Sequence, residues 1–354
     1  MDIFFVIESL VKILVIIFLA LLPAVAYGVQ TERKLSAYIQ NRIGPNRVGP
    51  FGLLQPLADI PKLFLKEDVV PANANKFVHS LGPLISITIA FSTFAVIPFG
   101  DAITVNVGGT DYTIKLQIAD VNIGFLYILA LSSLAVYGIT LSGWSSNNKY
   151  SLLGGIRSSA QMISYELSMG LSIIGVVMLA NTLQLDDIVR SQGGYWDSVG
   201  IVPSWYIFLQ PIGFITFFVS MFAETNRLPF DLPEAEPELV AGYHTEYSGM
   251  KFGMFMLSEY LAMITAASMV TTLYLGGWQA PYIEHLGLSP ILVSIVQVGS
   301  FATKVIAIIL FFMIVRWSMP RFRYDQLMNL GWKVMLPLAL LNIALTGFFI
   351  LYFS

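Results

Sequence analysis

The sequence predicts an all-α integral membrane protein with eight transmembrane helices, an interfacial amphipathic helix and a small extramembrane β-hairpin. Apolar residues make up 56% of the 354 residues and charged residues only 12%. The mean hydropathy is +0.73, and a soluble domain usually carries about 25% charged residues. Apolar runs long enough to cross a bilayer also recur along the whole chain. Lipid must therefore solvate most of it, and we expect one polytopic membrane domain covering residues 1–354.

Eight stretches have the roughly 20 mostly apolar residues that a membrane helix needs. The first is too long for the apolar core of a signal peptide, and no small-residue cleavage site follows it. Glu8 and Lys12 inside it have the i, i+4 spacing that predicts an ion pair on one helical face. The predicted spans are Ile3–Val29, Leu81–Phe99, Ile123–Leu141, Met162–Leu179, Trp205–Phe222, Phe252–Leu275, Ile291–Val315 and Val334–Phe353.

Lysine and arginine predict the orientation, because they gather in loops on the cytoplasmic side. Fifteen of the 19 basic residues fall in the odd-numbered loops. The even-numbered loops hold only Lys115 and Arg190, and Lys12 and Lys304 lie within spans. We therefore expect the odd-numbered loops to face the cytoplasm and both termini to face the outer side. The basic residues follow membrane topology and do not form a nucleic-acid-binding surface.

The even-numbered loops carry little sign of chemistry. Ile103–Val107 and Tyr112–Ile118 alternate apolar and polar residues around the residues Gly-Gly-Thr-Asp, which predicts a β-hairpin outside the membrane. Residues 182–204 are predicted to form a polar loop.

Residues 52–66 predict an amphipathic helix at the membrane surface. Leu53, Leu57, Ile60 and Phe64 are spaced by 4, 3 and 4 residues, and the polar residues Gln55, Asp59, Lys62 and Lys66 repeat that spacing on the opposite face. Such a helix is either a wall over an opening to the lipid or a plain interfacial helix, and periodicity alone does not separate the two.

Ionisable residues at membrane depth call for explanation, because a charge there costs roughly 2.5–3.5 kcal/mol on insertion scales. Glu166 lies just inside the fourth span, Glu259 inside the sixth and Lys304 midway along the seventh. A functional role is favoured for the two carboxylates, each of which has a tyrosine beside it. The alternative is a structural hydrogen bond to a neighbouring helix.

The loop after the fifth span is unusually acidic. Between residues 223 and 252 it holds six acids, namely Glu224, Asp231, Glu234, Glu236, Glu238 and Glu246, against Arg227 and Lys251. Because apolar residues are interleaved with the acids, we expect a packed or re-entrant segment facing a polar cavity and not a solvated loop. Carboxylates clustered in a low dielectric raise one another's pKa, which would let them carry protons near neutral pH.

Several kinds of site are excluded. The chain has no cysteine, so it holds no thiolate metal site, iron–sulfur cluster or cysteine nucleophile. His79, His244 and His285 are far apart in the sequence and predict no metal site. No glycine-rich nucleotide motif and no hydrolase nucleophile elbow occurs.

Four blocks of sequence resemble one membrane subunit of complex I, the proton-pumping NADH:quinone oxidoreductase. That subunit forms the quinone chamber next to the peripheral arm. The blocks occur in the family's order and touch most of the chain. They are TERKLSAYIQNRIGPNRVGPFGLLQPLADIPKLFLKE at 31–67, SGWSSNNKYSLLGGIRSSAQMISYE at 142–166, AETNRLPFDLPEAEPELVAGYHTEYSGMKF at 223–252 and RWSMPRFRYDQLMNLGWK at 316–333.

The resemblance implies a role in quinone reduction and proton translocation. It implies a narrow quinone chamber walled by the first span, the interfacial helix and the sixth span. It further implies that NADH, FMN and iron–sulfur clusters are bound by partner subunits of the peripheral arm, and that other membrane-arm subunits are neighbours. This chain would bind quinone as substrate, carry no redox centre and lie in a bacterial inner membrane with periplasmic termini.

Residue by residue, the resemblance implies two sets of functional side chains. The carboxylates leading from the chamber into the membrane are Glu166, Glu224, Glu234, Glu236, Glu238 and Glu259. The side chains at the chamber are Glu32, Arg33, Asp59, Arg227 and Asp231. Pro237 is predicted to restrict Glu236 to extended conformations.

Three alternatives remain open from the sequence. A membrane subunit of a related hydrogenase-type complex shares some of these motifs. A secondary transporter would use intramembrane carboxylates to bind ions, but it predicts an internal inverted repeat that this sequence lacks. A passive membrane anchor would not need charged residues inside its spans.

Overall fold

The computed structural model describes residues 3–107, 110–195, 203–232, 236–283 and 289–353. Helices dominate it, with one small antiparallel sheet among the described residues. The longer helices are α1 Ile3–Val15, α2 Leu22–Ile39, α3 Gln55–Leu65, α4 Lys76–Ser92, α5 Gly124–Ser145, α6 Lys149–Ala180, α9 Pro211–Glu224, α11 Gly249–Tyr274, α12 Pro290–Ser318 and α14 Leu336–Phe353. The shorter helices are α7 Leu185–Ser191, α8 Tyr206–Leu209, α10 Glu236–Leu239 and α13 Tyr324–Leu330. Two π-helical turns, η1 Ile16–Leu21 and η6 Gly331–Met335, join α1 to α2 and α13 to α14.

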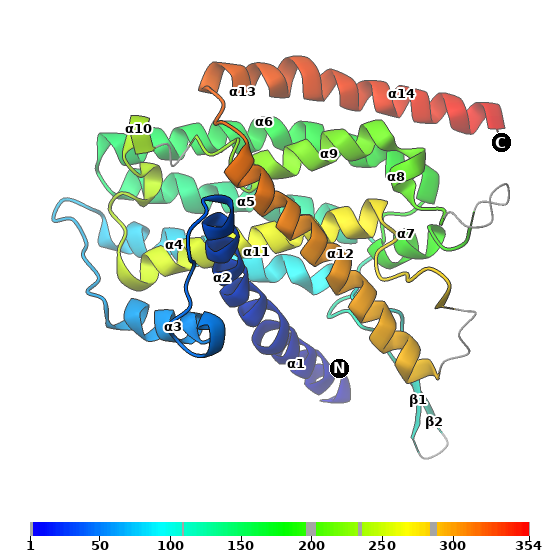
Figure 1. Ribbon diagram of the computed structural model, residues 1–354. Helices are drawn as coiled ribbons and strands as arrows, with labels where there is room; N and C mark the ends of the chain where they lie inside the picture. The colour runs from blue at the N-terminus through cyan, green and yellow to red at the C-terminus, as the bar shows by residue number, and fades with distance from the viewer. Residues whose placement is uncertain (1–2, 108–109, 196–202, 233–235, 284–288, 354) are drawn as a thin grey trace.

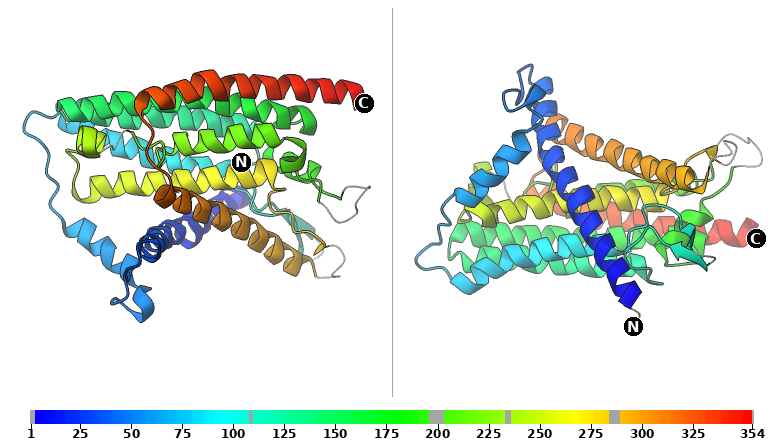
Figure 2. Two further views of the ribbon diagram at one scale, coloured as in Figure 1. Left: turned by 45° about the horizontal axis from the view of Figure 1, so that its top comes forward. Right: turned by 90° about the horizontal axis from the view of Figure 1, so that it is seen from below.

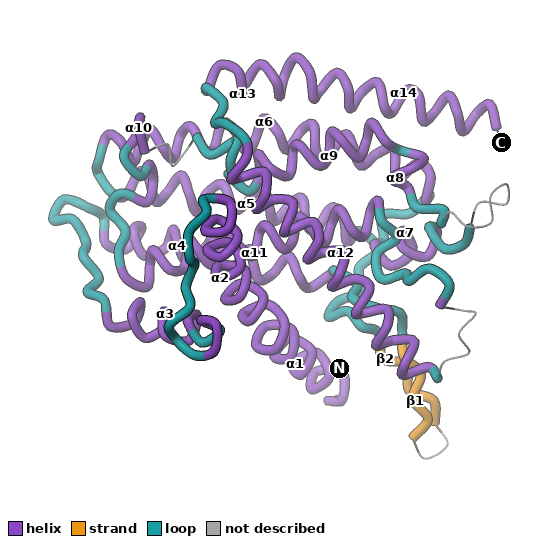
Figure 3. The backbone as a smooth tube through the Cα atoms, in the orientation of Figure 1, coloured by secondary structure: helices purple, strands orange, loops and turns teal. Residues whose placement is uncertain are grey.

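Five long helices lie side by side and form the body of the molecule. α4 packs on α5, α5 on α6, α6 on α9, and α11 on α4. α14 runs along the outside of α6, whereas α1–α2 and α12 cross the bundle obliquely (Figures 1 and 2). The start of α1 and the end of α14 lie toward the end of the bundle that carries the hairpin, α7 and α8. The loops with α3 and α10 lie at the opposite end (Figure 3).

Seven helices in the described chain are long and apolar enough to cross a membrane. They are Val6–Ile39, Lys76–Val96, Gly124–Ser145, Lys149–Ala180, Gly249–Tyr274, Pro290–Ser318 and Tyr324–Tyr352. Each contains or overlaps one of the predicted spans. The fourth begins 13 residues before the predicted start at Met162, because Asn148 caps it by accepting a hydrogen bond from the Tyr150 backbone N–H at 3.0 Å.

The fifth predicted span is not one continuous helix. Trp205–Phe222 is predicted as a single run, but the chain forms α8 and α9 with a break at Gln210, whose φ and ψ are −127° and 52°. Pro211 begins α9, where its missing N–H costs no hydrogen bond. An apolar run does not reveal such a break by hydropathy, and α9 alone has only 14 residues.

The hairpin forms with a shorter second strand than predicted. β1 Ile103–Val107 pairs with β2 Thr110–Ile114 in the register Ile103 to Ile114. The predicted strand Tyr112–Ile118 was wrong at both ends. The strand begins at Thr110, which pairs with Val107, and it ends at Ile114, before Leu116 accepts a hydrogen bond from the Phe99 N–H outside the ladder. The predicted polar loop 182–204 was also wrong in part, since it contains α7, whose Leu185 and Ile188 are buried.

α3 forms within the predicted segment 52–66. Pro56 lies in its first turn, where proline is tolerated, and Pro61 lies inside it. Gly52, just before it, has φ +76°, and a Cβ there would lie 2.2 Å from the Pro45 carbonyl oxygen, so no other residue fits without a shift. The apolar side chains Leu57 and Phe64 are exposed in the isolated chain.

Candidate functional site

A buried arginine joins three segments that are far apart in the sequence. Arg227 Nη1 lies 2.7 Å from Glu32 Oε2, and Arg227 Nε lies 2.6 Å from Glu259 Oε1. The second contact is an ion pair without a hydrogen bond, because the Nε–H does not point at the Glu259 oxygen. The arginine side chain is 1% exposed. Burial alone would lower the pKa of Arg227, but Glu259 and Glu32 raise that pKa above its ordinary value. The guanidinium is therefore a permanent charge between α2 and α11.

A tight turn after α9 delivers Arg227 to this position. Asn226 has φ 50°, and the Phe230 N–H donates to the Arg227 carbonyl at 2.8 Å. From α6, Gln161 Nε2 donates to the carbonyls of Ala223 and Phe230, both at 2.8 Å, and so fastens both ends of the turn. The expectation that this acidic loop is packed and not solvated is confirmed, because Phe230 and four other apolar side chains of the loop are buried.

Two more side chains complete the charge cluster, which we define as Glu32, Arg227, Glu259, Tyr260 and Arg316. The Tyr260 hydroxyl donates to Glu32 Oε2 at 2.6 Å, and the Arg227 guanidinium lies over the Tyr260 ring at 4.4 Å. Arg316, near the end of α12, pairs with the other oxygen of Glu32. Helices α2, α11 and α12 therefore meet the acidic loop at one cluster.

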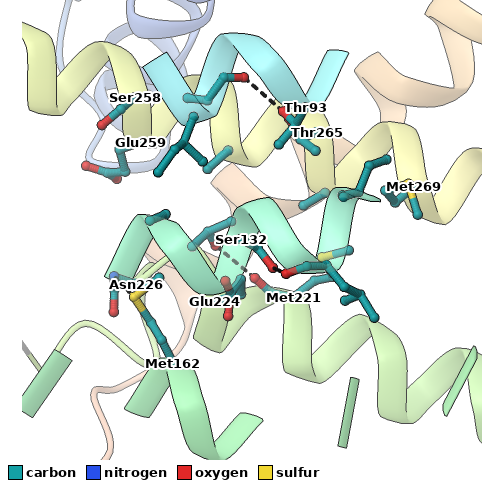
Figure 4. A pocket seen from close by; sticks show the side chains of 18 of the residues that line it. Thr93, Ser132, Met162, Met221, Glu224, Asn226, Ser258, Glu259, Thr265 and Met269 are labelled. Atoms are coloured by element: carbon teal, nitrogen blue, oxygen red, sulfur yellow. Dashed lines mark hydrogen bonds between the residues drawn. The ribbon is translucent and has the colours of Figure 1, made fainter. Parts of the chain in front are cut away.

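A cavity of about 120 Å³ lies beside the charge cluster inside the bundle. Glu259 from α11 and Glu224 from α9 line it on different walls, with Asn226, Ser132 and Ser258 as further polar groups (Figure 4). Most of the remaining lining is apolar and includes methionine, isoleucine and phenylalanine side chains, with a few further hydroxyl groups such as those of Thr93 and Thr265. At about 30 Å³ per molecule, the cavity has room for about four waters between these carboxylates.

Glu166 and Glu224 form a second pair of acids, without a neighbouring cation among the described residues. Glu166 Oε1 accepts a hydrogen bond from Ser133 of α5. The carboxylates of Glu166 and Glu224 are close enough to interact electrostatically. Glu224 Oε2 is buried and has no hydrogen-bond partner in the part of the chain that the structure describes. A polar group in this state is costly unless it is protonated or bound to water.

The other predicted site residues form ion pairs nearer the surface. Arg33 Nη1 lies 2.6 Å from Asp59 Oδ2, which ties α2 to α3. Arg321 Nη2 lies 2.9 Å from Asp231 Oδ2, and Arg157 Nη1 lies 2.6 Å from Glu238 Oε2. The sequence predicts that the acids gather with one another, whereas each of these three acids is paired with an arginine.

Two predicted acids lie partly or wholly outside what the structure describes. Glu234 lies outside the described residues. Glu236 begins the short helix α10, so the prediction that Pro237 keeps it extended was wrong. In the described ranges, no three histidine, aspartate or glutamate side chains come together as a possible metal site.

Sequence reasoning missed four side chains of the site. Arg157, Arg316 and Arg321 were counted only as signals of topology, although each neutralises a carboxylate. Tyr260 was noted only as the neighbour of Glu259, yet its hydroxyl binds Glu32. The number of acids near membrane depth was the available signal, since buried carboxylates need cations or donors close by.

Comparison with known proteins agrees with this architecture. Residues 11–347 match the family described as NADH dehydrogenase. The chain is 50% identical over 349 residues to an NADH-quinone oxidoreductase subunit of Cytophaga hutchinsonii, covering 99% of this chain and 98% of that protein. It is 52% identical over 337 residues to an NADH-quinone oxidoreductase subunit of Geobacter sulfurreducens and 49% identical over 342 residues to one of Rhodothermus marinus, covering 95% of each chain in both cases. Because the match covers nearly the whole length of this chain, the chain belongs to the NADH dehydrogenase family.

Proposed function

We propose that this chain is the membrane subunit of a proton-translocating NADH:quinone oxidoreductase that helps to form the quinone chamber and couples quinone reduction to proton movement. Relatives that carry the name NADH-quinone oxidoreductase are about 50% identical along nearly the whole chain. The observation that carries the proposal is the position of Glu259, which pairs with Arg227 and also lines the internal cavity. A change of charge at the cluster would therefore act, through Glu259, on the cavity in the membrane interior.

The chamber side of the proposal uses the residues at the junction of α2, α3 and the acidic loop. These are Glu32, Arg33, Asp59, Arg227 and Asp231. A quinone head group needs two electrons and two protons on reduction. Negative charge on the reduced head group near Glu32 and Arg227 would change the proton affinity of the carboxylates around it.

The proton path in this proposal begins at Glu259 and continues through the cavity to Glu224 and Glu166. Water in the cavity would connect Glu259 to Glu224, and electrostatic repulsion would couple Glu224 to Glu166. Glu234, Glu236 and Glu238 would supply the path from the acidic loop. Coupling needs an element with two arrangements, and the loop with Arg227 is our candidate.

The redox centres of this proposal lie in partner subunits. NADH, FMN and iron–sulfur clusters would be bound by the peripheral arm, and this chain, which has no cysteine, would take part in the reaction only as a subunit. Its partners would be the quinone-site and iron–sulfur subunits of that arm, the neighbouring membrane-arm subunits and lipid.

The proposed topology has eight crossings in a bacterial inner membrane, with both termini in the periplasm. α8 and α9 would together make the fifth crossing. The Gln210 N–H at their junction donates to the Tyr206 carbonyl at 2.7 Å, and Gln210 Nε2 donates to Thr346 Oγ1 at 2.8 Å. α3 would lie at the interface with Leu57, Ile60 and Phe64 toward lipid.

Purification in mild detergent tests the proposal directly. We expect the tagged chain to co-isolate with NADH-oxidising and iron–sulfur subunits and with NADH:quinone activity sensitive to quinone-site inhibitors. Co-isolation with hydrogenase subunits and no NADH activity would favour the hydrogenase-type alternative. Isolation as a lone chain with ion transport activity would favour a transporter.

A further inference from the structure

Lys304 lies midway along α12, and its ammonium is held by backbone oxygens. Lys304 Nζ donates to the carbonyls of Leu275, Gly277 and Gln279 at 2.8, 2.9 and 2.7 Å. The Trp205 ring closes a fourth side, with the ammonium 4.4 Å from the ring centroid. Three carbonyl oxygens and an aromatic face are groups that attract a monovalent cation. We call these four groups the carbonyl cage.

The carbonyl cage is held rigidly by contacts that do not involve Lys304. Gly276 and Gly277 have φ values of +69° and +54°, and a Cβ at Gly276 would lie 2.4 Å from Trp205 Nε1. The Gly277 N–H donates to the Thr271 carbonyl at 2.8 Å, and the Gly276 N–H donates to Gln192 Oε1 at 3.0 Å. The carbonyls therefore converge because the turn at the end of α11 is fixed, with its partial negative charge directed at the ammonium.

α12 is much less covered by the rest of the bundle than α11 is. Only 28% of its most apolar stretch is buried, against 61% for α11, and it crosses the bundle obliquely (Figure 1). In lipid no hydrophobic driving force holds an exposed helix to the bundle, so close packing and interhelical hydrogen bonds must do so. Ser300, one turn before Lys304, also donates to the Gln279 carbonyl, at 3.1 Å.

Arg316 lies twelve residues after Lys304 on the same continuous helix, a separation of about 18 Å along the axis. Arg316 pairs with Glu32 in the charge cluster. A rotation or slide of α12 at the carbonyl cage would therefore move Arg316 relative to Glu32, because the helix between them contains no break.

We propose that Lys304 is a positioning residue: its ammonium fills the carbonyl cage as a built-in cation and so fixes α12 where Arg316 meets Glu32. The inference rests on the proposed function of the charge cluster. In this role Lys304 transfers no proton. What matters is a positive charge in the cage, because that charge holds the turn after α11 and the facing side of α12 together.

The test uses the assembled enzyme in detergent and the variant Lys304→Ala, which removes a group the size of propylammonium. We expect the apparent KM for a short-chain quinone to rise roughly tenfold, in line with the loss of interhelical polar contacts. The kcat at saturating quinone and the artificial-acceptor activity should change little. Added propylammonium should lower the KM of this variant part of the way back to the wild-type value, since it refills the carbonyl cage. Added 1-propanol, which has the same size but no charge, should not lower it. Thr303→Ala is the matched control, because Thr303 is exposed and its hydroxyl donates to the Gly299 carbonyl of the same helix.

Each other outcome has a defined meaning. Loss of proton pumping in Lys304→Ala with an unchanged KM would overturn the inference in favour of a proton relay. A wild-type KM, or no response to propylammonium, would also overturn it. Where Lys304→Ala does not assemble, assembly becomes the readout, and propylammonium during solubilisation must restore it or the inference fails. An unchanged KM in assembled Arg316→Gln would instead contradict the proposed role of the charge cluster itself.

Discussion

Arg227 and Arg316 balance the charges of Glu32 and Glu259 at one buried point. Glu32 has a different cation on each carboxylate oxygen, and Glu259 depends on Arg227. Burying separated charges costs several kcal/mol per ion, which only close pairing offsets. The cluster is therefore neutral as a unit and sensitive to the loss or gain of any single charge.

Removal of Arg227 should destabilise the protein strongly. Arg227→Met leaves Glu259 and one oxygen of Glu32 without their cation, and breaking a buried pair in this way costs about 3–5 kcal/mol. We expect little assembled complex on native gels. Adding Glu259→Gln to the same chain removes one of the stranded charges and should recover part of the assembly. Arg227→Met at wild-type levels would contradict the pairing described here.

Glu166→Gln separates a structural role from a proton relay. Glutamine keeps the shape and can still accept the Ser133 hydrogen bond, so a purely structural Glu166 should lose about 1 kcal/mol or less. For a relay, we expect an assembled complex with strongly reduced proton pumping and quinone-linked turnover but normal artificial-acceptor activity. Glu166→Asp should retain part of the function, because it remains titratable. Near-normal pumping in assembled Glu166→Gln would remove this residue from the proposed path.

The identity of the acids at membrane depth was predictable from the sequence, and their partners were not. A carboxylate in an apolar run is conspicuous, which is how Glu166 and Glu259 were found. Arg227 lies 32 residues from Glu259 and 195 residues from Glu32 along the chain, and no local spacing indicates that it joins them. The pair Glu8–Lys12, at 2.6 Å, was predicted correctly because both residues lie on one helix at i, i+4.

At the scale of elements, α3 is joined to α2 by one ion pair at its polar face. Asp59 accepts from Arg33 at 2.6 Å and from Gln55 at 3.1 Å. The polar face was predicted from its spacing, and this internal hydrogen bond agrees with it. The structure adds that Asp59 is directed toward Arg33 of α2.

Asp59→Ala should weaken quinone reduction selectively. The change removes the ion pair between α2 and α3 at the proposed chamber, and it lies at the surface, so the stability cost should stay near 1 kcal/mol or below. We expect reduced NADH:quinone activity with artificial-acceptor activity intact, measured on the same membranes. Lys62→Ala, on the same face of α3, is the matched control. Equal loss of both activities in Asp59→Ala would point to failed assembly.

Hydropathy located the membrane helices but not their ends or breaks. The predicted fourth span omitted 13 residues of α6, because Lys149 and Arg157 made that part of the helix resemble a loop. The break at Gln210 was invisible for the opposite reason, since the residues on both sides of it are apolar. The hydropathy of a segment indicates whether lipid or water surrounds it. The ends of the helix depend instead on where its backbone hydrogen bonds begin and end.

At the scale of the whole molecule, the charge asymmetry and the arrangement of the helices point to the same topology. The start of α1 and the end of α14 lie toward the end of the bundle that carries the hairpin (Figure 1). The loops at the opposite end hold most of the basic residues. We therefore expect a reporter fused after Ser354 to be active on the periplasmic side, as measured by alkaline phosphatase activity. A matching fusion within loop 66–76 should be inactive there. The same result for both fusions would contradict an even number of crossings, and the reverse pattern would contradict the predicted orientation.

The π-helical turn η1 also has a consequence for changes in chain length. A π-helical turn holds one residue more than the α-helical turn it replaces. Deleting one residue within Ile16–Leu21 would therefore restore a regular helix and leave Glu8–Lys12 and Glu32 on their original faces. The same deletion within residues 22–29 would turn one side of the helix by about 100° relative to the other. That rotation would move either Glu32 away from Arg227 or α1 away from the residues it now faces. We therefore expect the first membrane helix to tolerate the loss of one residue within the π-helical turn but not within residues 22–29.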